Sequence, residues 1–274
     1  MNNNLPTFVK WAGGKSQLIQ QYKGLLPDKA ERYFEPFLGS GAVFFYVKQH
    51  LKCKQFFLSD SNEELINTFL AVRDNVDVLI ESLVKRKILH SKEYFLETRK
   101  EKPSELSRVE RASRFIYLNK TCYNGLYRVN SKGEFNVPLG SYKRPTIVAE
   151  VSLRKASGLL KGADIKVRRF SETVSSATEG DFVYFDPPYL PISKTSSFTG
   201  YTRDSFLIDE QEELARLFER LDEKKCLLML SNSDHPVTRQ LYQKYNIHTV
   251  KARRAISSVG TDRKSTRLNS SHRL

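Results

Sequence analysis

The sequence has few cysteines and no long apolar run. Cys53, Cys122 and Cys226 lie far apart without a CxxC pair, so we expect no disulfide framework. The five histidines show no paired spacing, and we expect no metal. No apolar run reaches the roughly 18 residues of a membrane span, and the start, MNNNLPTF, lacks the basic stretch and apolar block of a secretory signal. These absences predict a cytoplasmic protein with no membrane partner.

Positive charge is in excess. Lys and Arg number 45 against 31 Asp and Glu, which gives a net charge of +14 and a pI near 9.6. This excess favours a polyanionic partner, above all nucleic acid, although charge alone is also compatible with a basic protein that has no such partner. With 274 residues and 39% hydrophobic residues, the chain can form one large domain or a domain with a sizeable insertion.

Short β-rich runs alternate with amphipathic segments. The expected strands are Arg32–Phe34, Gln55–Leu58, Ile165–Val167, Phe182–Phe185, Leu227–Leu230 and His248–Val250. The expected helices are one starting near Ala42, Glu63–Arg73, Ser152–Leu160, Asp209–Leu221 with an Asp209/Glu212 capping box, and Val237–Tyr245. This alternation predicts an α/β fold with a mostly parallel, Rossmann-like sheet and helices on both faces.

Residues 76–145 break this alternation. A long, charge-rich helical segment is followed there by a turn-rich stretch, SKGEF, that contains Gly133. We therefore expect residues 1–75 and 146–261 to form the main domain and residues 76–145 to form an inserted helical and hairpin subdomain. An insertion beside the ligand crevice of such a sheet can hold a large substrate.

The first candidate motif is FVKWAGGKS, Phe8–Ser16. Paired glycines before a lysine suggest a backbone that approaches an anionic ligand. A Walker loop needs a glycine five positions before Gly14, and Val9 stands there, so a triphosphate P-loop is disfavoured. A glycine turn with a solvated Lys15 remains an alternative.

The second motif is FEPFLGSG, Phe34–Gly41, which lies between an expected strand and the helix near Ala42. Asp60 ends the next strand about twenty residues later, where its carboxylate can accept ribose hydroxyl protons. The dinucleotide fingerprint fails because Phe44 stands where a third glycine belongs. The motif therefore predicts nucleoside binding rather than phosphate binding.

The third motif is VYFDPPY, Val183–Tyr189, an apolar strand that ends in an acid, two prolines and an aromatic. Pro187 and Pro188 fix φ and donate no hydrogen bond, so carbonyls are directed outward beside Asp186, and Tyr189 offers a ring face. These acceptors and this stacking surface suit an exocyclic amino group on a planar base. A proline turn with a capping Asp is the alternative.

The three motifs, in this order, resemble Dam-type (D12 class) DNA adenine N6-methyltransferases, and the resemblance covers Phe8 to about Ile256. It implies S-adenosylmethionine as co-substrate, with Gly39 and Gly41 under its methionine end and Asp60 on its ribose. The implied cofactor-binding residues are Trp11, Ala12, Gly13, Lys15, Glu35, Phe37, Gly39, Gly41, Asp60 and Asp186. The implied catalytic residues are Asp186, Pro187, Pro188 and Tyr189, with no metal.

An adenine N6 lone pair is delocalised into the ring and needs help to attack a methyl group. Hydrogen bonds from the amino group to Asp186 and to the Pro187 carbonyl would localise that pair. Because N6 points into a paired duplex, the adenine must leave the stack, at a cost of a few kcal/mol, and Tyr189 would stack on it.

Tyr117–Gly140, YLNKTCYNGLYRVNSKGEFNVPLG, combines aromatics, amides and an arginine, which are the residue types that read bases. Arg128 can bind guanine, Asn124 a base edge, and Tyr123 can wedge into the gap of a flipped nucleotide. A surface hairpin with a small apolar core is the alternative. The segment is similar to the recognition hairpin of GATC-methylating Dam-type enzymes, which implies these DNA contacts: Lys10, Tyr123, Asn124, Leu126, Arg128 and Pro138.

Several further interpretations remain open. Lys132, Lys143 and Arg144 can neutralise phosphates or lie on a solvated face. Phe198–Thr202, FTGYT, can form a loop that orders around the flipped base, and Leu230–Asn232, LSN, ends a strand without an assigned role. We expect a monomer with double-stranded DNA as its partner, in a restriction-modification or other setting. The alternatives are a cytosine N4-methyltransferase, an inactive DNA-binding homologue and an RNA methyltransferase.

Residues 262–274 differ from the rest of the chain. Asp262–His272, DRKSTRLNSSH, contains one apolar residue and resembles the translation of a sequencing-library adaptor, so we expect a non-native tail. A natural basic tail that touches DNA is the alternative. The family resemblance implies a final strand after RRAIS, and its replacement would leave a sheet position unpaired and lower the stability of the fold.

Overall fold

The computed structural model describes residues 5–190, 206–253 and 263–270. The chain divides into two compact units. The first contains residues 1–16, 39–49 and 60–167, and the second contains residues 17–38, 50–59 and 168–274. Each unit is therefore assembled from three separate stretches of the sequence. The expected loop Phe198–Thr202 lies outside the described residues.

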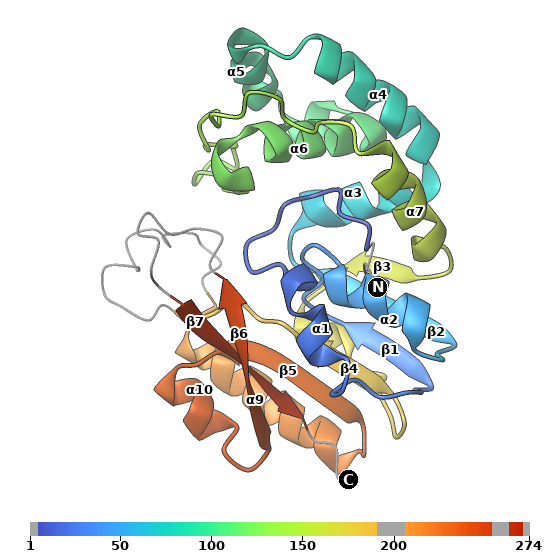
Figure 1. Ribbon diagram of the computed structural model, residues 1–274, viewed down its shortest axis with the longest axis vertical. Coiled ribbons are helices and arrows are strands. Elements are labelled where there is room, and N and C mark those ends of the chain that lie inside the picture. The colour runs from blue at the N-terminus through green and yellow to red at the C-terminus, as the bar shows by residue number, and fades with distance from the viewer. Residues whose placement is uncertain (1–4, 191–205, 254–262, 271–274) are drawn as a thin grey trace. The chain divides into compact units, whose positions relative to one another are not determined.

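A sheet forms the centre of the second unit. Six of its strands are β1 (Arg32–Glu35), β2 (Gln55–Asp60), β4 (Phe182–Phe185), β5 (Leu227–Ser233), β6 (Asn246–Arg253) and β7 (Arg263–Ser270). With β3 (Asp164–Val167), the order of the seven-stranded sheet is β3-β2-β1-β4-β5-β7-β6 (Figure 1). The pairs β1/β2, β1/β4 and β4/β5 are parallel, whereas β7 is antiparallel to both of its neighbours. The α/β fold with a mostly parallel sheet is thus confirmed.

Burial explains the composition of the central strands. All four residues of β4, FVYF, are buried, as is typical of a parallel strand that is covered on both faces. Helix α9 (Ile208–Glu223) contributes Leu214, Phe218 and Leu221, at helical spacing, to the same apolar core. The other helices of this unit are α1 (Ile19–Tyr22), α8 (Phe170–Thr173) and α10 (Pro236–Leu241).

The first unit is mainly helical, with α6 (Arg108–Thr121) against three other helices. α6 contacts α3 (Glu63–Asp74), α4 (Val76–Ile88) and α5 (Lys92–Lys100). It starts with a capping box in which Ser107 and Glu110 satisfy each other's backbone N–H groups. The remaining elements are α2 (Ala42–His50), α7 (Glu150–Leu160), β3 (Asp164–Val167) and the short 3-10 turns η2 (Pro103–Glu105) and η3 (Tyr123–Gly125). A further turn, η1 (Lys15–Gln17), spans the boundary of the two units.

The expected elements agree with the observed ones except in two details. Each of the six expected strands lies within an observed strand. The helix expected over Val237–Tyr245 is shorter, because α10 ends at Leu241 and a turn precedes β6. The expected Asp209/Glu212 capping box is wrong: α9 begins at Ile208, and Glu210 Oε2 accepts the Leu207 N–H at 2.9 Å.

The domain division predicted from the sequence differs from the compact units. Residues 76–145 belong to the first unit together with residues 60–75 and 146–167. Compactness does not assign function, so the division into a main domain and a recognition insertion stays a prediction.

Residues 263–270 occupy a place in the sheet, which corrects the expectation of an unpaired sheet position. As β7 they lie between β5 and β6, with Leu230 opposite Asn269 and Val250 opposite Thr266. Ladder hydrogen bonds join backbone groups, so a strand with one apolar residue can fill this position. The non-native origin of residues 262–274 stays a prediction.

Removal of residues 263–274 tests the contribution of β7. It would leave the facing edges of β5 and β6 without a partner, and we expect the melting temperature to fall by about 4 °C or more. Removal of residues 271–274 alone serves as the control. Equal melting temperatures for the two truncated proteins, measured by calorimetry, would contradict a stabilising role of β7.

Candidate functional site

The segment around the paired glycines forms a tight turn in the first unit. Gly14 N–H donates to the Trp11 carbonyl at 3.1 Å, and Gly13 has a φ of +79°. Lys15 is only 4% exposed, and its Nζ donates to the Gly13 carbonyl at 2.7 Å. The solvated lysine considered above is therefore wrong. Ala12 is exposed at the tip of this turn.

Gly39 and Gly41 follow β1 in conformations that favour glycine. Gly39 has a φ of +49°, and a Cβ there would lie 2.9 Å from Trp11 Cδ1. Gly41 has a φ of +69°, and a Cβ there would lie about 3 Å from the ring of Phe69. The absence of a side chain at Gly39 thus allows the Trp11 indole to approach its backbone, and the absence of one at Gly41 leaves room for the Phe69 ring.

Asp60 lies at the end of β2 and joins this cluster. Its Oδ2 accepts the Gly39 N–H at 3.0 Å, and its Oδ1 accepts the Asn62 N–H at 3.0 Å. Burial raises the pKa of this carboxyl, while the backbone N–H groups of Asn62, Gly39 and Ser61 oppose that rise. A carboxylate offers about four acceptor positions, so these bonds leave capacity for a ligand hydroxyl. Trp11, Gly39 and Asp60, which lie far apart in the sequence, therefore meet in this unit.

Two further cofactor candidates, Glu35 and Phe37, belong to the second unit. Glu35 is 2% exposed and accepts the Tyr33 hydroxyl at 2.7 Å. Phe37 stacks on Phe170 with ring centroids 5.5 Å apart and meets Phe206 edge-on at 5.6 Å. Glu35 is the last residue of β1, and Phe37 follows it two positions later in the sequence.

The segment Asp186–Tyr189 follows β4, and we call it the acceptor turn. Asp186 and Tyr189 are half-buried, Pro187 is buried and Pro188 is exposed. The Tyr189 hydroxyl lies 3.5 Å from Asp186 Oδ1 and 3.2 Å from Ser231 Oγ. The turn therefore keeps a partly exposed carboxylate beside the hydroxyl of Tyr189, and the roles predicted for these residues stay predictions.

Sequence reasoning missed the residues that support the acceptor turn. Ser231 Oγ also lies 3.3 Å from the Tyr22 hydroxyl, and Gln211 Nε2 donates to the Pro188 carbonyl at 3.1 Å. These side chains come from α1, α9 and β5, so no local spacing connects them. The only signal was the polar pair Ser231 and Asn232 at the end of an apolar strand.

The residues after α6 form a turn and a hairpin in the first unit. Asn124 has a φ of +54°, and antiparallel bridges join Val129 to Phe135 and Cys122 to Leu139. Tyr123, Asn124, Arg128 and Pro138 are exposed and Leu126 is half-buried. Arg128 Nε donates to Asn136 Oδ1 at 2.7 Å, which sets the direction of the guanidinium. A surface hairpin is thus present, and four of its five candidate DNA contacts are exposed.

Asn119 joins this hairpin to the N-terminal segment. It is 1% exposed, its Oδ1 accepts the Lys10 N–H at 2.7 Å, and its Nδ2 donates to the carbonyls of Lys10 and Gly125 at 2.8 Å. Gly125 has a φ of +66°, and a Cβ there would overlap the Lys10 side chain. Lys10 Nζ lies over the Tyr142 ring at 3.9 Å. Lys10 is therefore fixed beside the hairpin.

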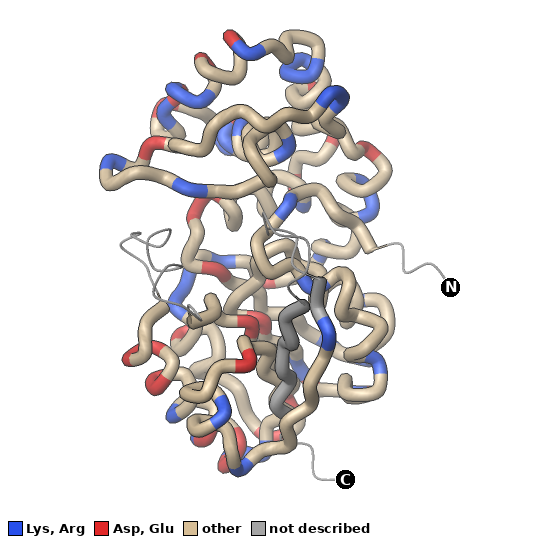
Figure 2. The backbone as a smooth tube through the Cα atoms, turned by 60° about the vertical axis from the view of Figure 1, so that its left-hand side comes forward, with Lys and Arg blue, Asp and Glu red and all other residues tan. Residues whose placement is uncertain are grey.

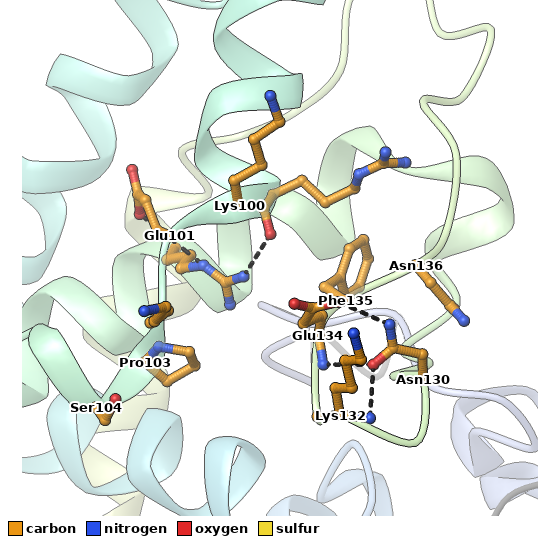
Figure 3. A pocket seen from close by; sticks show the side chains of 13 residues that line it. Lys100, Glu101, Pro103, Ser104, Asn130, Lys132, Glu134, Phe135 and Asn136 are labelled. Atoms are coloured by element: carbon orange, nitrogen blue, oxygen red, sulfur yellow. Dashed lines mark hydrogen bonds and ion pairs between the residues drawn. The ribbon is translucent and has the colours of Figure 1, made fainter.

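A cavity of about 510 Å³ lies between the end of α5, α6 and the hairpin (Figure 3). Asn130 closes the hairpin tip, since its Oδ1 accepts two backbone N–H groups and its Nδ2 donates to Glu134. The charged residues that line the cavity are Arg99, Lys100, Glu101, Lys102, Arg114, Lys132 and Glu134. Lys and Arg also recur along the helices of this unit (Figure 2). The surplus of positive charge suits an anion such as a phosphate.

In residues 5–190, 206–253 and 263–270, no three His, Cys, Asp or Glu side chains group together as a metal site. Within the same described part of the chain, no helix is long and apolar enough to cross a membrane.

Comparisons with known proteins agree with one another. A family described as D12 class N6 adenine-specific DNA methyltransferase matches residues 11–256. The chain is 42% identical over 266 residues to the Type II methyltransferase M1.LlaDCHI of Lactococcus lactis subsp. cremoris, with 95% of this chain and 92% of the relative covered. It is 43% identical over 273 residues to the Type II methyltransferase M.MjaIII of Methanocaldococcus jannaschii, with 94% of each covered. It is 36% identical over 259 residues to the DNA adenine methylase of Escherichia coli K12, with 94% and 91% covered.

Gly39→Ala tests the contact between Gly39 and Trp11. The new methyl group meets Trp11 Cδ1, and the positive φ adds strain of about 1–2 kcal/mol, so we expect lower stability. Trp11 is the only tryptophan, so its fluorescence emission should shift. Gly158→Ala in α7 is the control, because nothing lies within 4 Å of its Cβ. Identical emission and melting for both variants would contradict the contact.

Proposed function

Because the chain belongs to the D12 class of N6 adenine-specific DNA methyltransferases, we propose that it methylates N6 of adenine in the sequence GATC of double-stranded DNA. Adenine-specific DNA methylation is the activity of the class. The target sequence and the roles of individual residues are the proposal. The observation that carries it is the acceptor turn, in which the Asp186 carboxylate lies beside Tyr189 at the end of a buried parallel strand.

S-adenosylmethionine, the methyl donor of the class, supplies a methyl group activated by a sulfonium. The first unit fits this group, because Asp60 retains acceptor capacity for ribose hydroxyls after it binds Gly39 and Asn62. The Trp11 indole on the Gly39 backbone offers an apolar wall beside that carboxylate. Ala12, Gly13, Lys15, Gly41, Glu35, Phe37 and Asp186 complete the proposed cofactor-binding set, and no metal is proposed.

The acceptor turn binds the amino group of the target adenine. Asp186 and the Pro187 carbonyl accept its two N–H groups, which localises the N6 lone pair for attack and stabilises the positive charge that develops on nitrogen. Tyr189, held by Ser231, stacks on the base. Pro188 completes the proposed catalytic set because its ring restricts the turn.

The hairpin provides the contacts to DNA. Arg128 and Asn124 carry groups that read guanine and a base edge, and exposed Tyr123 can wedge between bases when the adenine is flipped. Lys10, Leu126 and Pro138 lie on the same segment or packed against it. The exposed cations Lys132, Lys143 and Arg144, with the basic cavity, suit phosphates.

The proposal extends to the location, oligomeric state and biological role of the protein. A DNA substrate is consistent with the cytoplasmic location expected from the sequence, and a single chain contains every proposed group, which supports a monomer. Two relatives are named Type II methyltransferases, which favours a restriction-modification role.

Asp186→Ala tests the acceptor turn. The amino group of adenine would lose its charged acceptor, so we expect methyl incorporation into duplex DNA to fall by about 100-fold or more. Asp209→Ala, an exposed carboxylate at the start of α9, is the matched control and should retain activity. Labelled methyl transfer gives the rates, and an Asp186→Ala rate near that of the wild type would refute the assignment.

GATC specificity is tested by protection of plasmid DNA. Plasmid treated with the protein and S-adenosylmethionine should resist a nuclease that is blocked by adenine methylation in GATC. The same plasmid incubated without the methyl donor is the control. Complete cleavage after clear methyl uptake would mean that another sequence is the target.

A further inference from the structure

Leu230–Asn232 lies near the end of β5, beside the acceptor turn. The parallel register pairs Phe185, the last residue of β4, with Leu230, so the last three residues of β5 extend beyond the end of β4, where the acceptor turn begins. Ser231 lies next to Tyr189, and Asn232, which is fully buried, turns towards α9. The polar end of this strand therefore connects the turn to a neighbouring helix.

A directed chain of hydrogen bonds runs from β5 to the acceptor turn. Asn232 Oδ1 accepts the Ser233 N–H at 2.8 Å, and Asn232 Nδ2 donates to Gln211 Oε1 at 2.9 Å. Gln211 Nε2 then donates to the Pro188 carbonyl at 3.1 Å. Both ends of the chain are backbone groups: the Ser233 N–H can only donate, and the Pro188 carbonyl can only accept. The orientation of both amides is therefore fixed by chemistry.

Burial makes this chain costly to break. Gln211 and Asn232 are each 0% exposed, so neither amide can exchange its partner for bulk water. Gln211 lies in the first turn of α9, 21 residues before Asn232, and the two meet only because α9 packs on β5. A buried amide that loses its partner is strongly unfavourable, which holds the two side chains in this arrangement.

The hydrogen bond to Pro188 acts on a turn with few remaining degrees of freedom. Proline rings fix φ at Pro187 and Pro188, so ψ is the main soft angle at each residue. A donor that holds the Pro188 carbonyl fixes ψ at Pro188 and with it the direction in which Tyr189 leaves the turn. Ser231 holds the far end of the Tyr189 side chain. The acceptor turn is thus held at two points, the Pro188 carbonyl and the Tyr189 hydroxyl.

We propose that Gln211 and Asn232 are positioning residues that fix the Pro188 carbonyl, thereby aim Tyr189, and hold the C-terminal end of the turn that carries Asp186 and the Pro187 carbonyl to the target amine. The inference rests on the proposed function, because it assigns a reaction to the acceptor turn. Neither residue touches the base or the methyl donor. They act through the backbone of the turn.

Single-turnover methyl transfer to duplex DNA tests this role. Gln211→Met keeps the length of the side chain and removes the donor, and we expect the rate at saturating S-adenosylmethionine to fall about tenfold or more with little change in affinity for the methyl donor. The donor affinity, measured by calorimetry, and the melting temperature show that the variant is folded.

Gln211→Glu separates positioning from a general loss of structure. The ionised carboxylate repels the Pro188 carbonyl, whereas the protonated carboxyl donates to it and still accepts from Asn232. Burial raises the pKa of such a carboxyl, so the rate relative to the wild type should recover as the pH falls from about 8.5 to 6. The neighbouring carboxyl groups are present in both proteins, so their effect on the rate cancels in this ratio; they are Asp186, Asp209, Glu210 and Asp234. Gln240→Glu, exposed on α10, is the control with a flat ratio.

The outcomes are distinct. The proposal is supported if Gln211→Met methylates slowly and the rate of Gln211→Glu recovers at low pH. A slow Gln211→Met together with a Gln211→Glu rate equal to the wild type at every pH, because the new carboxyl stays protonated, also supports it. A Gln211→Met rate equal to the wild type, or a Gln211→Glu that stays slow down to pH 6, overturns it. If Gln211→Met does not fold, the Gln211→Glu profile decides. A wild-type protein that binds S-adenosylmethionine but does not methylate adenine would instead count against the proposed function.

Discussion

The parallel pairing of β4 with β5 is the constraint on which the acceptor turn depends. Parallel strands end at the same edge, so the register that places Phe185 opposite Leu230 also brings the acidic turn and the polar end of β5 together. Backbone hydrogen bonds and apolar packing set this register, and both are independent of the site. An apolar core thus determines where the polar groups lie, and the polar groups then fix one another through Ser231 and Gln211.

Much of this arrangement could be predicted from the sequence, because it is encoded locally. The six expected strands were apolar runs between turn residues; Asp186 follows such a run directly, and Asp60 and Gly39 follow theirs after a few residues. The tertiary contacts could not be predicted in this way. Gln211 looks like any polar residue at a helix start, and only the packing of α9 on β5 turns it towards Pro188. The pairing of residues 263–270 as a strand could not be predicted from their composition, because backbone groups form the ladder.

The two compact units divide the candidate residues between them. Trp11, Gly39 and Asp60 belong to the first unit, and Glu35, Phe37 and Asp186 belong to the second. The chain passes from the second unit to the first at Leu38–Gly39 and again at Ser59–Asp60. Gly39 and Asp60 stand near these two crossings and are joined directly, because the Gly39 N–H donates to the Asp60 carboxylate at 3.0 Å.

The three hydrogen bonds of Asn119 have a consequence for the order in which the protein matures on the ribosome. Its partner Lys10 is synthesised 109 residues earlier, so the N-terminal segment has to wait for α6 to emerge before its main chain is held. Gly125 follows a few residues later and closes the same junction. A nascent chain stalled before this point would lack the hydrogen bonds to the Lys10 main chain, although the rings that contact Phe8, those of Phe45 and Phe69, would already be made.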